Sequence, residues 1–144
     1  MGLYRKASHT TYDCRYHIVW ITKYRRKVLN KGMQERLKEL LEVFALDLYV
    51  KIIRLGKEED HVHMYVSVPV SCWIPDVVQQ FKGGSSKILG EEFSEHLKKF
   101  YWKKKALWAV GYFVATVGEV NDEVIKRYVE QQGREEVLGK EIEL

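Results

Sequence analysis

Two histidines, two positions apart, are the residues whose type and spacing most clearly suggest chemistry. His61 and His63 stand in the run Asp60-His61-Val62-His63, where apolar and polar residues alternate as in a strand. Residues i and i+2 of a strand face the same side, about 6.6–6.8 Å apart along its axis, so both imidazoles can converge on one ion. Two ligands do not make a metal site, so a third must come from elsewhere in the fold. The alternative is a pair of solvent-facing histidines.

The last predicted helix, which runs from an Asn121 cap to about Gln132, carries further candidates. At about 100° per residue, Tyr128 and Gln132 share its apolar arc one turn apart, and Gln131 falls just outside that arc. A glutamine on a buried stripe needs a partner, because an unpaired buried amide costs about 1–3 kcal/mol. A metal ion or a phosphate would serve. The helix pattern alone favours Tyr128 as a core aromatic whose hydroxyl is hydrogen-bonded.

Basic residues gather in two stretches, Lys23–Lys27 and Lys98–Lys105. The second interleaves Phe100, Tyr101 and Trp102 with lysines, a combination suited to phosphate contact and base stacking on single-stranded nucleic acid. An ordinary solvated face is an equal alternative on these residues alone.

Composition narrows the class of protein. The chain has 144 residues, about one domain, and its 46% hydrophobic content excludes a disordered chain. The net charge is +4, but the tail Arg134–Leu144 carries −2, so the residues before it carry +6. A basic domain favours an anionic partner, nucleic acid first among several. The uncharged apolar run Ala106–Gly118 has 13 residues, too short for a membrane helix of about 20.

Cellular context follows from what the sequence lacks. Cys14 and Cys72 are too few for a disulfide framework, and Arg5 and Lys6 interrupt any signal-peptide pattern after Met1. We expect a cytoplasmic protein that does not associate with membranes.

The pattern of elements predicts an α+β fold. The order is strand, helix, strand, strand, helix, strand, helix, which is the split βαβ, ferredoxin-like arrangement plus a C-terminal helix. It implies one antiparallel sheet with helices packed on it. The expected elements are a strand over Thr10–Lys23, a helix capped by Asn30, strands over Tyr49–Leu55 and His61–Val70, a helix opened by Pro75, a strand over Trp108–Val117 and the last helix.

Two consecutive glycines, Gly83 and Gly84, fall inside the second predicted helix, where each costs about 1 kcal/mol relative to alanine. Such a cost suggests that something packs very close to the backbone. Close packing of helix on sheet is favoured over a phosphate cradle, because Gly83–Ser86 lacks the spacing of a phosphate-binding loop.

Taken in order, these motifs resemble the single-tyrosine HUH transposases of small insertion sequences that move as single-stranded DNA. The resemblance spans roughly Tyr12 to Gly133, so we expect residues 1–133 to form a single HUH transposase domain and 134–144 an acidic C-terminal tail. The matching segments are Trp20–Arg26, Asp60–His63, Lys82–Lys87, Gly111–Val114, Thr116–Gly118 and Tyr128–Gln132.

The resemblance implies a role for each site residue. His61 and His63 would bind a divalent metal, Mg²⁺ or Mn²⁺, and Gln132 would be the third ligand, with Gln131 a lesser rival. Tyr128 would be the nucleophile that forms a covalent 5′-phosphotyrosine. No general base is assigned.

The resemblance also implies partners. Members of the family recognise DNA hairpins near the element ends and act as homodimers, in which the histidine pair of one chain meets the tyrosine helix of the other. On charge alone, the candidates for DNA contact are Lys23, Arg25, Arg26, Lys103, Lys104 and Lys105.

Two other functions stay open at this point. One is a domesticated relative that acts on dispersed hairpin repeats. The other is a non-catalytic nucleic-acid-binding module, since a ferredoxin-like sheet can also display stacking aromatics. The second predicts no role for His61 or His63. A metal-dependent hydrolase of small molecules would need more ligands than the sequence offers.

Overall fold

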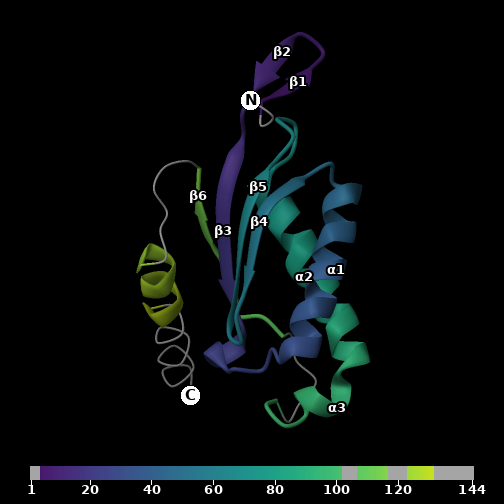
Figure 1. Cartoon of the computed structure of the whole chain (residues 1–144), viewed down its shortest axis with the longest axis vertical. Helices are drawn as coiled ribbons and strands as arrows, with labels where there is room; N and C mark the ends of the chain where they lie inside the picture. The colour runs from purple at the N-terminus through teal and green to yellow at the C-terminus, as the bar shows by residue number, and fades with distance from the viewer. Residues whose placement is uncertain (1–3, 102–106, 117–122, 132–144) are drawn as a thin grey trace.

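A four-stranded antiparallel sheet organises the chain in the computed structural model, which describes residues 4–101, 107–116 and 123–131 (Figure 1). Its strand order is β4-β5-β3-β6, and β5 separates the two strands that α1 connects, so the split βαβ, ferredoxin-like prediction is confirmed. The strands are β3 (Arg15–Ile21), β4 (Lys51–Lys57), β5 (His61–Ser67) and β6 (Phe113–Ala115). A separate hairpin of β1 (Arg5–Ala7) and β2 (Thr10–Tyr12) projects from one end of the sheet.

The two faces of the sheet are covered by different helices. α1 (Lys31–Asp47) and α2 (Ile74–Glu92) lie on one face, and the helix over residues 123–131 lies on the other (Figure 1). Two short helices, η1 (Lys23–Arg25) and α3 (Ser94–Leu97), follow β3 and α2. Within the described ranges, no helix combines the length and the apolar character needed to cross a membrane.

Local sequence signals explain why these elements form where they do. Asn30 caps α1, because its side-chain oxygen accepts a hydrogen bond from the Met33 amide at 2.9 Å. The alternation in β5 sends one set of side chains, Val62, Met64 and Val66, into the core beneath the helices. The other set therefore faces the helix over residues 123–131.

The expected strand over Thr10–Lys23 is wrong in its extent, because it divides into β2 and β3, which pair in different sheets. The break falls at Asp13 and Cys14. There the Asp13 carboxylate accepts two hydrogen bonds, both 2.6 Å, from the Arg15 guanidinium, and the Cys14 carbonyl accepts one from the Val68 amide at 2.8 Å.

The expected strand over Trp108–Val117 is wrong at its start, because β6 begins only at Phe113 and Trp108 forms an isolated bridge with Thr22. Val117 lies outside the described residues. Gly111 adopts a positive φ of 92°, which interrupts the extended backbone. The Lys82 ammonium donates to the carbonyls of Ala109 and Gly111, at 2.8 and 2.7 Å. These carbonyls therefore accept hydrogen bonds from a side chain instead of from a neighbouring strand.

The paired glycines of α2 do mark a close approach, but the neighbour is a helix and not the sheet. A Cβ at Gly84 would lie 2.7 Å from the ring of Phe44 on α1, whereas a Cβ at Gly83 would meet nothing within 4 Å. The serines that follow are also structural. Ser85 accepts a hydrogen bond from Trp108 Nε1 at 2.9 Å, and Ser86 accepts one from the Leu107 amide at 3.0 Å. Both hydroxyls anchor the segment that leads into β6.

Candidate functional site

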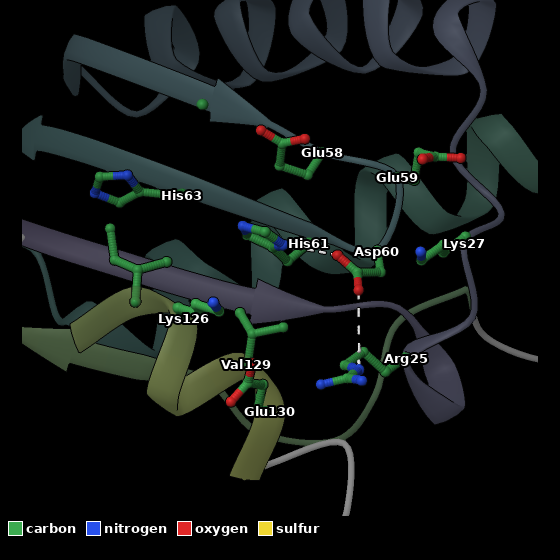
Figure 2. A pocket seen from close by; sticks show the side chains of 12 residues that line it. Arg25, Lys27, Glu58, Glu59, Asp60, His61, His63, Lys126, Val129 and Glu130 are labelled. Carbon is green, nitrogen blue, oxygen red and sulfur yellow. Dashed lines mark hydrogen bonds and ion pairs between the residues drawn. The ribbon is translucent and has the colours of Figure 1, made fainter. Parts of the chain in front are cut away.

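The two candidate metal-binding histidines lie on the sheet face that the helix over residues 123–131 covers. His61 and His63 are both half-buried on β5, and both line one pocket of about 620 Å³ (Figure 2). The pocket is lined by both carboxylates and cationic side chains, so it can bind either a metal ion or a phosphate. Its other lining residues are Arg25, Lys27, Gly56, Glu58, Glu59, Asp60, Ile125, Lys126, Val129 and Glu130.

Asp60 links His61 to Arg25. Its carboxylate accepts a hydrogen bond from His61 Nδ1 at 2.8 Å and lies 3.9 Å from Arg25 Nε (Figure 2). Burial by itself would raise the pKa of Asp60, but the hydrogen bond from His61 and the positive charge of Arg25 outweigh burial and lower that pKa. The ionised carboxylate can only accept, so His61 carries a hydrogen on Nδ1, and in a neutral ring the lone pair is then on Nε2.

Arg25 reaches Asp60 from a strained loop. Tyr24 and Arg25 have positive φ angles of 58° and 53°, a conformation that non-glycine residues seldom adopt. The Arg25 amide donates to the Thr22 carbonyl at 2.8 Å, and the Tyr101 hydroxyl donates to the Lys23 carbonyl at 2.8 Å. These contacts hold the loop, and with it the guanidinium, against the pocket.

His63 contacts a third imidazole, which sequence reasoning did not assign to the site. His17 on β3 places its Nδ1 3.3 Å from His63 Nε2, and its ring stacks on Tyr65 with the ring centres 4.3 Å apart. Burial, followed by the charge of Arg54, lowers the pKa of His17. Alternation placed His17 on the face of Val19 and Ile21, but only the pairing of β3 with β5 brings that face beside His63.

The donor set fits a divalent cation in its chemistry, because two imidazoles stand beside several carboxylates in one pocket. Among the residues that the structure describes, no group of three or more His, Cys, Asp or Glu side chains is arranged to hold a metal ion. Gln132 lies outside the described residues. Gln131 is exposed and does not line the pocket. The assignment of a third ligand stays a prediction.

Tyr128 does not join the histidine pocket of its own chain. On the same helix, Ile125 and Val129 are buried against the sheet beside Val19 and Ile21. The half-buried Tyr128 ring instead packs on Phe113 of β6, with the ring centres 5.4 Å apart. Tyr128 is absent from the residues that line the pocket. The single chain therefore brings His61 and His63 together in one pocket but leaves the candidate nucleophile outside that pocket.

The basic residues nominated for DNA contact have different surroundings. Arg25 lines the pocket, and the ammonium of Lys23 lies 5.4 Å from the centre of the Tyr24 ring. The Arg26 guanidinium donates to the Phe100 carbonyl and lies 5.3 Å from the Tyr24 ring and 5.5 Å from the Tyr101 ring. Arg26 thus has a structural role of its own. Lys103, Lys104 and Lys105 lie outside the described residues.

Known proteins match this chain over nearly its whole length. The sequence profile of the family described as "Transposase IS200 like" matches residues 10–132. The transposase for insertion sequence element IS200 from Salmonella typhimurium is 30% identical over the whole chain and 93% of its own length.

Two solved structures share the fold. A crystallised Deinococcus radiodurans protein, described as a candidate transposase, superposes with a TM-score of 0.80 at 33% identity, over 89% of this chain and 97% of its own. A REP-associated tyrosine transposase, solved bound to a REP hairpin, gives a TM-score of 0.57 at 12% identity, over 87% and 69% of the two chains, a likeness of fold alone. Because the profile and the relatives span nearly the whole chain, this protein belongs to the IS200-like transposase family.

Proposed function

We propose that this transposase cuts and rejoins single-stranded DNA at the ends of an insertion sequence, through a covalent 5′-phosphotyrosine and with a divalent metal ion. One observation carries the proposal: in a chain of this family, His61 is oriented by Asp60 in the pocket that His63 also lines. Dedicated carboxylate support of an imidazole is the arrangement that metal-ligating histidines use.

The cleavage step assigned to Tyr128 is an in-line displacement. The phenol oxygen attacks the scissile phosphorus, the bond from phosphorus to tyrosine oxygen forms, and the bond from phosphorus to the 3′ oxygen breaks. The phenol proton is lost and the departing 3′ oxygen gains one, so the step is balanced without a further reactant. In the rejoining step another 3′-OH attacks the phosphotyrosine and releases Tyr128. The number of ester bonds is conserved, so ATP is not needed.

His61 and His63 would hold the metal ion, with Gln132 proposed as the third protein ligand. When bound, the ion would polarise and position the scissile phosphate. His61 presents Nε2 because Asp60 occupies Nδ1, so the ligand is oriented before an ion arrives. Since imidazoles are softer ligands than Mg²⁺ usually takes, Mn²⁺ is expected to bind more tightly than Mg²⁺.

A homodimer with composite sites fits the position of Tyr128. Within one chain, Tyr128 packs on Phe113 and does not line the pocket of His61 and His63. A second chain could supply its own Tyr128 to that pocket. The proposed assembly therefore pairs the histidines of one chain with the tyrosine helix of its partner.

A DNA hairpin is the proposed recognition element. The REP-associated relative was solved with such a hairpin, and the present chain shares its fold. Arg25 lines the pocket together with Lys27 and Lys126, where these cations could contact the DNA backbone. A domesticated relative acting on dispersed repeats would use the same site. Paired hairpin ends flanking the gene would favour a mobile element.

The deciding experiment incubates the protein with labelled single strands of the flanking DNA and Mn²⁺, then separates protein-linked DNA on a denaturing gel. A covalent adduct is expected with the parent and with Tyr49→Phe, a control that removes the hydroxyl of an exposed tyrosine. No adduct is expected with Tyr128→Phe. An adduct of parental yield from Tyr128→Phe would refute the assignment. His63→Ala should keep hairpin binding but lose cleavage, whereas a non-catalytic binding module would show no cleavage even in the parent.

A further inference from the structure

We propose that His17 is a positioning residue that holds the ring of His63 by accepting a hydrogen bond from its Nε2. This inference rests on the proposed role of His63 as a metal ligand. His17 would then serve His63 as Asp60 serves His61, so each of the two candidate ligands would have its own partner.

The geometry of the two rings favours a direct hydrogen bond. His17 Nδ1 and His63 Nε2 are 3.3 Å apart, the ring centres are 5.6 Å apart, and the planes differ by 16°. The distance between the ring centres exceeds the distance between the two nitrogens by about two ring radii, one radius for each imidazole. The two nitrogens therefore lie close to the line between the centres and point at each other, as the donor and acceptor of one bond do.

The same alignment argues against His17 as a further metal ligand. Two nitrogens 3.3 Å apart are too close for an ion on the line between them, since each metal–nitrogen bond is about 2.0–2.1 Å long, so their lone pairs would have to converge beside that line. Here the lone-pair directions oppose each other along that line. In the described part of the chain, the three histidines also do not qualify as a metal-holding group. His17 is only 4% exposed, which suits an internal support more than a ligand open to the pocket.

His17 is itself held on two sides. Its strand β3 lies between β5 and β6, and His17 is in register with Tyr65 on one neighbour and Ala115 on the other. Its ring stacks on Tyr65 at 4.3 Å, and the Arg54 guanidinium lies 5.1 Å from the centre of the Tyr65 ring. A side chain fixed in this way can restrict the rotation of the His63 ring.

Which residue donates in this hydrogen bond follows from which ring nitrogen of His63 faces the pocket. His63 Nδ1 is 3.8 Å from the position that a Cβ at Gly56 would take, and Gly56 lines the pocket. A neutral imidazole has one N–H and one lone pair. When Nε2 carries the hydrogen and donates to His17, the lone pair remains on Nδ1, on the side of Gly56 and the pocket.

Manganese binding without DNA tests the proposal. Free Mn²⁺ is measured by electron paramagnetic resonance during titration of the full-length protein. His17→Phe keeps a ring against Tyr65 but loses the nitrogen, and we expect Mn²⁺ affinity to fall about 10- to 100-fold. His17→Asn retains a polar atom near the Nδ1 position and should recover most of the affinity. His9→Asn, at an exposed turn, removes an imidazole elsewhere and should leave affinity unchanged.

Parental Mn²⁺ affinity in a folded His17→Phe protein would overturn the positioning role while leaving the proposed metal site intact. If the parent binds no Mn²⁺, the metal-dependent function fails instead. Nitrogen-15 NMR of the unsubstituted, metal-free protein then decides the hydrogen bond separately, and also serves if His17→Phe does not fold. We expect His63 to carry its hydrogen on Nε2. A hydrogen on Nδ1 of His63, or a solvent-averaged mixture of the two forms, would contradict the proposal.

Discussion

The carboxylate of Asp60 accepts a hydrogen bond from Nδ1 of His61 at 2.8 Å, and this contact selects the ring nitrogen that His61 keeps for the pocket. The two residues are adjacent in the chain, but their orientation depends on the turn between β4 and β5. Arg25 comes from a different part of the chain, and its positively charged guanidinium lies 3.9 Å from the same carboxylate.

Replacing Asp60 should therefore weaken metal binding without removing a ligand. Asp60→Asn loses the charge that supports His61, and we expect Mn²⁺ affinity to fall about 10- to 100-fold. Calorimetric titration with Mn²⁺ measures the change. Asp13→Asn is the matched control, because Asp13 also pairs with an arginine, Arg15, but stands outside the pocket. Equal losses in both variants would show that Asp60 acts only on general stability.

Subunit complementation tests whether the active sites are composite. His63→Ala and Tyr128→Phe chains, each inactive alone, are co-expressed with different tags and assayed for cleavage. With random pairing half of the dimers are mixed, and each has one intact site, so about a quarter of the parental activity is expected. Purified mixed dimers that stay inactive would indicate that each site is built from a single chain.

The close approach of the two helices predicts opposite effects at neighbouring glycines. Gly84→Ala would place a Cβ 2.7 Å from Phe44, and overpacking of this kind costs about 1–3 kcal/mol. Gly83→Ala meets nothing within 4 Å and should stabilise the protein by about 0.5–1 kcal/mol through helix propensity. Urea unfolding measures both. Phe44→Leu should relieve the cost of Gly84→Ala, and stabilisation by both alanines would rule out the contact.

A buried hydroxyl should be required to hold the segment that leads into β6. Ser85→Ala removes the acceptor of Trp108 Nε1, and the unpaired indole N–H costs about 1–3 kcal/mol of unfolding free energy. Ser86→Ala should cost less, because Ser86 is half-buried and water can replace its contact with the Leu107 amide. Thermal unfolding compares the variants. A larger loss of stability in Ser86→Ala than in Ser85→Ala would contradict this prediction.

Signals within a few residues of each other were sufficient to predict much of the fold. The Asn30 cap, the alternation of β5 and the proline near the start of α2 each specify local conformation, and the structure places α1, β5 and α2 accordingly. Their order predicted the ferredoxin-like sheet. Strand ends were less accurate, because a contact such as Lys82 with Gly111 spans 29 residues and leaves no local pattern.

The sequence by itself determined which residue types could do chemistry: the spacing of His61 and His63 along a strand, and a tyrosine on the last helix. Only the tertiary structure decided their surroundings. Strand register sets His17 against His63, and a strained loop sets Arg25 against Asp60. Tyr128 turns toward Phe113 within its own chain. The physical reason is that short-range patterns specify the direction of a side chain from its own element, whereas its neighbours depend on how distant elements pack.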